Sequence, residues 1–301
     1  MTDFLSDYFS YLQESRLKAG ELKYYEINQH FWKDMASSHW REKRANFHQN
    51  FETVLHNLDD DVESAWGRQN KNFIARDNLF HYFSKVDAKW INDNMDTLAF
   101  DSTVHTLVRT RPVVFLSFHN FYQILIPIVL AQYFGPVSSF VLDEAAETDV
   151  LIRSYLSEMY KSMKQGLNGG SLLKVGVDKS DAIKRQVNQL LAQKGNIYAA
   201  IDMVHPLLGN KTKVSLSTKY FEMSVLMGVI ETGLKNNAQF AFPFISLVQD
   251  GTLRLEMFIL NGSTTEEVLE SYRRVFDSLI SRDIAIWEGA SLLSYKEGRF
   301  S

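Results

Sequence analysis

Residues 112–142, PVVFLSFHNFYQILIPIVLAQYFGPVSSFVL, decide the fold. The apolar run Val113–Phe118 begins with two β-branched residues, which is typical of a strand buried on both faces. Ile124–Phe134 predicts an apolar helix that a Gly-Pro pair ends, and Val137–Leu142 predicts a second strand. A strand, a helix and a strand in this order indicate parallel strands joined by a helical crossover, and hence an α/β fold.

The C-terminal part of the chain repeats this alternation of strands and helices. We expect further helices over residues 149–165, 180–194, 222–234 and 263–280, and further strands over residues 172–177, 197–201, 239–247 and 253–259. Ser263 and Glu266 form a capping box for the last of these helices. The fold class that we expect is therefore α/β, with a parallel-rich mixed sheet flanked by helices.

Residues 1–110 differ in composition from the rest, because they contain no Pro and only two Gly. Aromatic residues recur there at helical spacing, and we expect helices over residues 2–17, 27–57, 60–86 and 88–98. The prediction is a helical N-terminal segment, residues 1–110, packed on an α/β core, residues 111–301. The aromatic stripe fits core packing, and a helix face that lies on a membrane surface is the alternative.

Composition excludes several kinds of protein. The 301 residues include no Cys, which excludes a Cys nucleophile, a Cys-ligated zinc or iron–sulfur site and a disulfide framework. The formal net charge of -4 gives no indication of a nucleic-acid partner. The N-terminus has no basic region before an apolar stretch, so we do not read it as a signal peptide. No run of about 20 residues is purely apolar, as a membrane-spanning helix requires, so we expect a cytoplasmic protein.

His119 is the most informative single residue. It follows the predicted strand Val113–Phe118, and ligands of open α/β sheets bind beyond the carboxyl ends of strands. Imidazole accepts a proton near neutral pH, so His119 is a candidate general base; a structural histidine that caps the next helix is the alternative. Asp202 ends the apolar run IYAAID in the same way, which indicates a crevice shared with His119. A turn Asp before a Pro-containing loop is the other interpretation of Asp202.

Other motifs of catalytic or metal sites are missing from the sequence. It has no HExxH or comparable ligand spacing, no GxSxG elbow and no glycine pattern of a phosphate or dinucleotide loop. We therefore expect no metal site, and an α/β-hydrolase is disfavoured.

Several segments resemble the lipid A late acyltransferases, which belong to the wider glycerolipid acyltransferase superfamily. The likeness covers roughly residues 40–300 and rests first on VVFLSF followed by His119–Phe121, and on LLAQKGNIYAAID at residues 190–202. Weaker pieces in the family's order are Arg41–Asn46, Asn50, Val54–Leu58, Phe80, Tyr82, Phe83, Tyr220–Phe221, Phe242–Phe244, Trp287 and Tyr295.

The resemblance implies transfer of a fatty acyl or aminoacyl group from the thioester of an acyl carrier protein or coenzyme A to a hydroxyl or an amine. It implies that His119 is the catalytic base and that Asp202 binds the acceptor or orients the site. The substrate-binding residues that we expect are Asn120, Tyr122, Gln123, Asp143 and Glu144. An acidic carrier would meet a basic patch, for which the candidates are Lys161, Lys164, Lys174, Lys211 and Lys213. No cofactor is expected, because the thioester is itself a substrate, and the expected membrane contact is peripheral, at the inner membrane.

Two departures from the family pattern bear on the mechanism. The family's membrane-anchoring N-terminal helix is not seen, and the acid that the family has five residues after the histidine is Ile124 here. In the family that carboxylate orients the histidine, as in a Ser-His-Asp site. Three interpretations follow: another acid orients His119, the acceptor is a better nucleophile such as an amine, or the chain is a non-catalytic relative that binds acyl chains or acts as a scaffold. The acids at hand are Asp143, Glu144 and Asp202. We expect a role in lipid tailoring or natural-product biosynthesis.

Overall fold

The computed structural model describes most of the chain. The described residues are 38–54, 60–79, 83, 85–107, 110–143, 150–176, 180–202, 213–248, 252–293, 295–296 and 299–300. The helix expected over residues 2–17 and the candidate residues Glu144 and Lys211 lie outside them. All statements about structure below concern the described residues.

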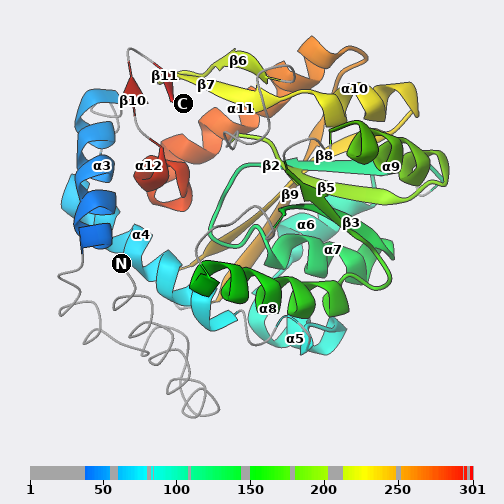
Figure 1. The fold of residues 1–301 in the computed structure, drawn as a ribbon, viewed down its shortest axis with the longest axis horizontal. Coiled ribbons are helices and arrows are strands. Elements are labelled where there is room, and N and C mark those ends of the chain that lie inside the picture. The colour runs from blue at the N-terminus through cyan, green and yellow to red at the C-terminus, as the bar shows by residue number, and fades with distance from the viewer. Residues whose placement is uncertain are drawn as a thin grey trace.

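A seven-stranded mixed sheet forms the centre of this structure (Figure 1). In spatial order its strands are β1 (Met95–Asp96), β9 (Leu253–Leu260), β8 (Gln239–Leu247), β2 (Val113–Ser117), β5 (Asn196–Ala200), β3 (Val137–Leu142) and β4 (Leu172–Val175). Among these strands only β8 and β9 pair in an antiparallel way. Every residue of the central strand β2 is buried, because helices cover both faces of the sheet. The expected α/β fold with a parallel-rich mixed sheet is confirmed.

Helices flank the sheet on both faces. The described helices are α3 (Ser38–Val54), α4 (Val62–Leu79), α5 (Ala88–Asn94), α6 (Leu98–Val104), α7 (Leu125–Phe134), α8 (Val150–Gly166), α9 (Ser180–Ala192), α10 (Gly228–Lys235), α11 (Thr265–Arg282), η4 (Ile284–Ile286) and α12 (Gly289–Leu292). Figure 1 shows α9, α10 and α11 on one side of the sheet and α6, α7 and α8 on the other. In the part of the chain that the structure describes, no helix combines the length and the apolar character needed to cross a bilayer.

A second, smaller sheet corrects one expected helix. Its strands, in spatial order, are β10 (Tyr295–Lys296), β11 (Arg299–Phe300), β7 (Glu222–Leu226) and β6 (Lys213–Ser217). We expected a helix over residues 222–234, but the helix α10 begins only at Gly228, and β7 pairs with β6 as an antiparallel hairpin. Met223 and Val225 are buried and the residues that flank them are less so, which is the period of a strand. A short apolar run fits both periods, so the prediction merged this strand with the helix that follows.

The N-terminal part also contains two elements that we did not expect. The helix predicted over residues 88–98 ends at Asn94, where the chain becomes extended and forms β1 and then α6. β1 pairs with β9 at the edge of the large sheet, so the segment before residue 110 contributes a strand to that sheet. The division of the chain at residue 110 stays a prediction. At the start of α11 the capping box is formed by Thr264 and Glu267, one residue later than expected.

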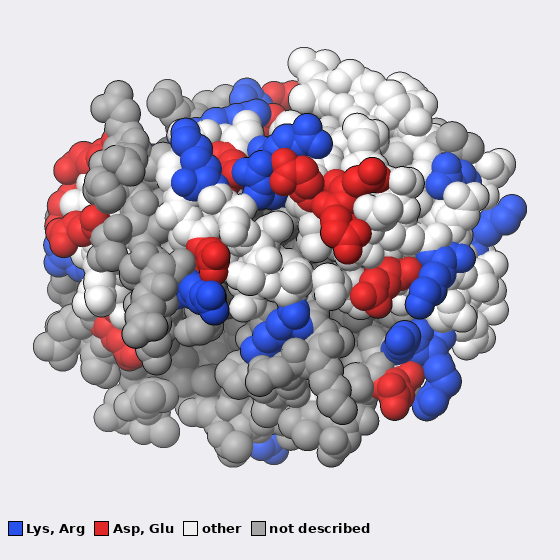
Figure 2. Space-filling view, turned by 90° about the horizontal axis from the view of Figure 1, so that it is seen from above, with Lys and Arg blue, Asp and Glu red and all other residues white. Residues whose placement is uncertain are grey.

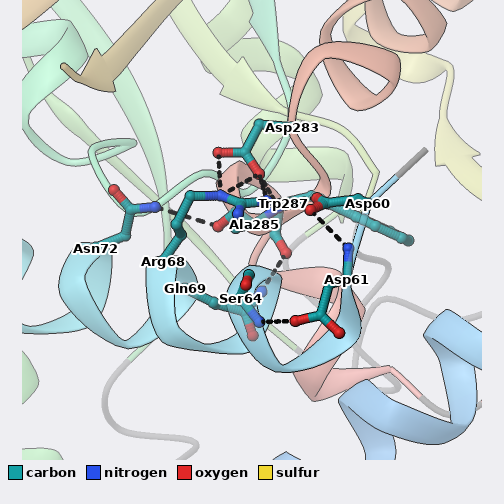
Figure 3. Close-up of polar contacts among 9 residues, drawn as sticks. All are labelled: Asp60, Asp61, Ser64, Arg68, Gln69, Asn72, Asp283, Ala285 and Trp287. Atoms are coloured by element: carbon teal, nitrogen blue, oxygen red, sulfur yellow. Dashed lines mark hydrogen bonds and ion pairs between the residues drawn. The ribbon is translucent and has the colours of Figure 1, made fainter. Parts of the chain in front are cut away.

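The helices α3 and α4 pack against the C-terminal end of the chain. The amide of Asn50 on α3 donates to the carbonyls of Ala290 and Leu293, at 2.9 and 2.8 Å. On α4, Gln69 donates to the carbonyl of Trp287 at 2.9 Å and Asn72 to that of Ala285 at 3.2 Å (Figure 3). Arg68 forms an ion pair with Asp283 at 3.1 Å in the same view. These contacts bind residues 283–293, which we call the C-terminal segment, to the N-terminal helices.

Candidate active site

The candidate site lies where the adjacent parallel strands β2 and β5 end. Ser117 is paired with Ala200, and the backbone N–H of Ile201 donates to the carbonyl of Ser117 at 3.0 Å. His119 and Asp202 each lie two residues beyond that pair, at the carboxyl ends of the strands. The structure thus brings together the two residues for which we predicted catalytic roles.

A buried carboxylate holds the imidazole of His119. Asp202 Oδ1 accepts hydrogen bonds from the backbone N–H and from Nδ1 of His119, both at 2.8 Å. Its other oxygen, Oδ2, accepts from Nε1 of Trp287, also at 2.8 Å. The side chain of Asp202 is 0% exposed and that of His119 is 23% exposed. We call His119 and Asp202 the dyad.

This arrangement determines which nitrogen of His119 carries the proton. A carboxylate only accepts hydrogen bonds, so Nδ1 is the protonated nitrogen when the imidazole is neutral. The lone pair is then on Nε2, for which the described residues offer no hydrogen-bond partner. Nε2 is therefore the atom that can accept a proton from a bound molecule.

The charge on His119 depends on its surroundings. Burial lowers the pKa of His119, but the attraction of Asp202, its hydrogen bond and the charge of Glu288 together outweigh burial and raise that pKa above 6.5. The protonated form of His119 is therefore stabilised by the protein.

The C-terminal segment supports the dyad from its other side. The backbone N–H of Glu288 donates to the carbonyl of His119 at 2.9 Å, and Trp287 forms a β-bridge with Asn120. The carboxylate of Glu288 is paired with Arg76 of α4 at 2.7 Å. We did not predict roles for Arg76 and Glu288. A polar stripe on α4, at helical spacing from residue 68 to residue 76, was the available sign of a buried polar contact.

Lys43 on α3 belongs to the same group of charges. Burial lowers the pKa of Lys43 to about 8, an effect that Glu288 opposes and Arg76 reinforces. Charged groups from α3, α4 and the C-terminal segment therefore meet around Glu288, whose backbone N–H donates to the carbonyl of His119. No pattern in the sequence indicates that Lys43 lies in this group of charges.

The residues after His119 form a turn into α7. Asn120 is buried, and its Oδ1 accepts from the backbone N–H of Tyr122 at 2.8 Å, while Nδ2 has no hydrogen-bond partner in the described structure. The Tyr122 hydroxyl donates to Oδ1 of Asn72 at 3.1 Å, and burial raises the pKa of this phenol, so it remains protonated. Gln123 is half-buried and its backbone N–H closes the turn on the carbonyl of Asn120. The roles of these three in substrate binding stay predictions.

The structure distinguishes two of the three acids that we considered as partners of His119. Asp202 contacts the imidazole. Asp143 follows β3, which lies on the far side of β5 from β2. Glu144 lies outside those residues. Ile124, the position of the family's acid, is half-buried against the core at the start of α7.

No protein-family model matches this sequence, and no curated protein with which the chain was compared gives a match. The resemblance to lipid A acyltransferases therefore stays a prediction. Within the described residues, no three His, Cys, Asp or Glu side chains gather as a metal site would require.

Proposed function

We propose that this protein transfers an acyl group from a thioester to a hydroxyl or amine acceptor, with His119 as general base. One observation carries the proposal: the 2.8 Å hydrogen bond between His119 Nδ1 and a fully buried Asp202, at the carboxyl ends of adjacent parallel strands. Ligands of open α/β sheets bind at such an edge. A histidine whose Nδ1 is held by a carboxylate is ready to take a proton at Nε2.

In the proposed reaction, His119 Nε2 takes the proton of the acceptor O–H or N–H as the acceptor attacks the thioester carbonyl carbon. The new bond joins the acceptor to that carbon, and the carbonyl oxygen becomes an oxyanion. When the oxyanion collapses, the C–S bond breaks, and the imidazolium returns the proton to the leaving thiolate. The products are the acyl ester or amide and a free thiol. Between these two proton transfers Asp202 stabilises the imidazolium. The buried position of Asp202 and its effect of raising the pKa of His119 support this role.

The oxyanion needs hydrogen-bond donors. The nearest candidate in sequence is Asn120, which follows the base and whose Nδ2 has no partner among the described residues. We propose it for this role.

The proposed donor is an acyl carrier protein or coenzyme A thioester. On the face drawn in Figure 2, Lys and Arg side chains lie side by side with Asp and Glu side chains. The ion pairs Arg273–Glu270 and Arg299–Glu222, at 2.6 and 2.9 Å, are examples from the described chain. Because acidic side chains accompany the basic ones on that face, we propose that an acidic carrier contacts α8. On α8, Lys161 and Lys164 are exposed one helical turn apart.

The test is transfer itself. Intact mass spectrometry of acyl carrier proteins and acceptors, incubated with the protein, should show the acyl group leave the carrier and appear on the acceptor. His119→Ala should slow this transfer about 10²–10⁴-fold, the usual worth of general-base catalysis, with an unchanged circular dichroism spectrum.

Unchanged turnover in His119→Ala would exclude His119 from the mechanism. Acyl-chain binding without transfer to any acceptor would support the non-catalytic relative instead. We also propose a cytoplasmic location with peripheral contact at the inner membrane, and recovery in the soluble fraction together with co-sedimentation with anionic vesicles tests it.

A further inference from the structure

The indole of Trp287 donates a hydrogen bond to the oxygen of Asp202 that accepts none from His119. Trp287 Nε1 donates to Oδ2 at 2.8 Å, while both hydrogen bonds from His119 end on Oδ1. A terminal carboxylate rotates easily about its last side-chain bond, and its two oxygens are equivalent until a neighbour distinguishes them. In this site the neighbour that distinguishes them is Trp287.

The indole itself is held from several sides. Trp287 is fully buried, and the ring of Phe221 stacks on it with a centroid distance of 5.0 Å and an interplanar angle of 5°. Phe276 and Phe300 meet the indole edge to face, at 5.7 and 5.1 Å. A Cβ at Gly289 would lie 2.6 Å from Nε1, so only glycine leaves room for the ring in this position.

The backbone of Trp287 is anchored on both sides. Its carbonyl accepts the amide of Gln69 from α4 at 2.9 Å (Figure 3). Its bridge to Asn120, and the hydrogen bond from Glu288 N–H to the His119 carbonyl, join it to the end of β2. The indole N–H is therefore fixed relative to the dyad, although Trp287 lies 85 residues after Asp202 in the sequence.

We propose that Trp287 is a positioning residue: its N–H locks the carboxylate of Asp202 so that Oδ1 keeps the proton of His119 on Nδ1 and leaves the lone pair on Nε2. The inference rests on the proposed function for its meaning in catalysis. Its structural content does not, because the location of a proton on a histidine is measurable without any substrate.

The experiment compares two variants that disturb the same aromatic cluster. Trp287→Phe removes the N–H and keeps an aromatic ring, whereas Phe221→Leu removes the stacking ring and keeps the N–H. Long-range ¹H–¹⁵N spectra at a pH above the His119 pKa report which imidazole nitrogen is protonated, and the spectrum of His119→Gln assigns the signals. We expect Nδ1–H in the wild type and in Phe221→Leu, and an increased share of Nε2–H in Trp287→Phe.

In the transfer assay, Trp287→Phe should lower kcat roughly tenfold with KM unchanged, since the acceptor site is not altered. An unchanged proton location in folded Trp287→Phe would overturn the inference, and so would an equal shift in Phe221→Leu. If Trp287→Phe does not fold, 3-benzothienylalanine in place of Trp287, which replaces only the N–H by sulfur, gives the same decision. Absence of acyl transfer in the wild type would refute the proposed function and leave the spectroscopic result standing.

Discussion

Replacing Asp202 by Asn should destabilise the protein at every pH, because an amide cannot serve all the donors that the carboxylate serves. Asp202 accepts two hydrogen bonds at Oδ1 from His119 and one at Oδ2 from Trp287. If the amide oxygen faces His119, the Trp287 N–H points at an NH₂ group. If the amide oxygen faces Trp287, the backbone N–H of His119 points at the NH₂ group. Either orientation leaves one buried donor without an acceptor, which costs about 1–3 kcal/mol.

A second loss depends on pH because it comes from the charge of His119. Burial lowers the pKa of His119, but Asp202 and Glu288 raise it above the ordinary value of 6.5. A pKa that is higher in the folded state adds stability that is fully present below the unfolded pKa and disappears as the pH rises through the folded pKa. Asp202→Asn should therefore cost more at about pH 5.5 than at about pH 9, by about 1.4 kcal/mol for each pKa unit that Asp202 contributes.

Urea unfolding followed by circular dichroism at these two pH values measures both losses. In a His119→Gln background the titrating group is gone, so Asp202→Asn should there cost the same at both pH values. Transfer by Asp202→Asn should fall about 10²–10⁴-fold, because the imidazolium loses its partner. The reasoning is refuted if the cost is equal or smaller in acid, or if its pH dependence persists without His119.

Three further variants test the position of the family's acid, the carrier contact and the room around Trp287. Ile124→Glu places a carboxylate at the family's position; because Nδ1 of the histidine is already bound, we expect a loss of about 1–3 kcal/mol in urea unfolding and no faster transfer, and a gain in rate would contradict this. Exchange of Lys161 and Lys164 together for Glu should raise the KM for an acyl carrier protein roughly tenfold at low salt, and this KM should then fall as salt screens the new repulsion. A coenzyme A thioester serves as the control donor that should not respond. Gly289→Ala places a Cβ 2.4 Å from the indole of Trp287, so the free energy of unfolding should fall by about 1–3 kcal/mol and transfer should be slower. Wild-type behaviour in both measurements would show that the indole has room to move.

The large sheet could be predicted because its strands are short apolar runs with clear ends. Val137–Leu142 and Gln239–Leu247 have the bounds that their composition predicted, and Val113–Ser117 differs by one residue. The small sheet could not be predicted in the same way. β7 runs into α10 with a single residue between them, and the pattern of burial changes period within an uninterrupted apolar stretch. β1 has two residues and owes its existence to its partner β9, which no local pattern reveals.

The dyad was predicted in part. That His119 and Asp202 end strands is visible in the sequence, and parallel strands bring such ends to one edge. The order of strands across the sheet is not visible. It decides that β5 lies next to β2 and that β3, which Asp143 follows, lies one strand further away. Of the acids considered in the sequence, Asp202 and Asp143 are therefore distinguished by the order of the strands. The bond from Trp287 to Asp202 joins residues 85 positions apart, and no short-range pattern announces it.

In the proposed mechanism, the carboxylate that orients His119 comes from the end of an adjacent strand. Ile124, the position of the acid in the family that the sequence resembles, is half-buried at the start of α7 and offers no carboxylate to Nδ1 of His119. A carboxylate at the end of the adjacent strand reaches the same nitrogen, because Ser117 and Ala200 are in register and each strand continues for two residues. At the strand end, the carboxylate also accepts the backbone N–H of the histidine, and this hydrogen bond joins the ends of the two strands. The cost of this position is a fully buried charge, and Trp287 offsets that cost by donating to the remaining oxygen. The buried carboxylate at the strand end thus has a buried donor opposite it, which the C-terminal segment supplies.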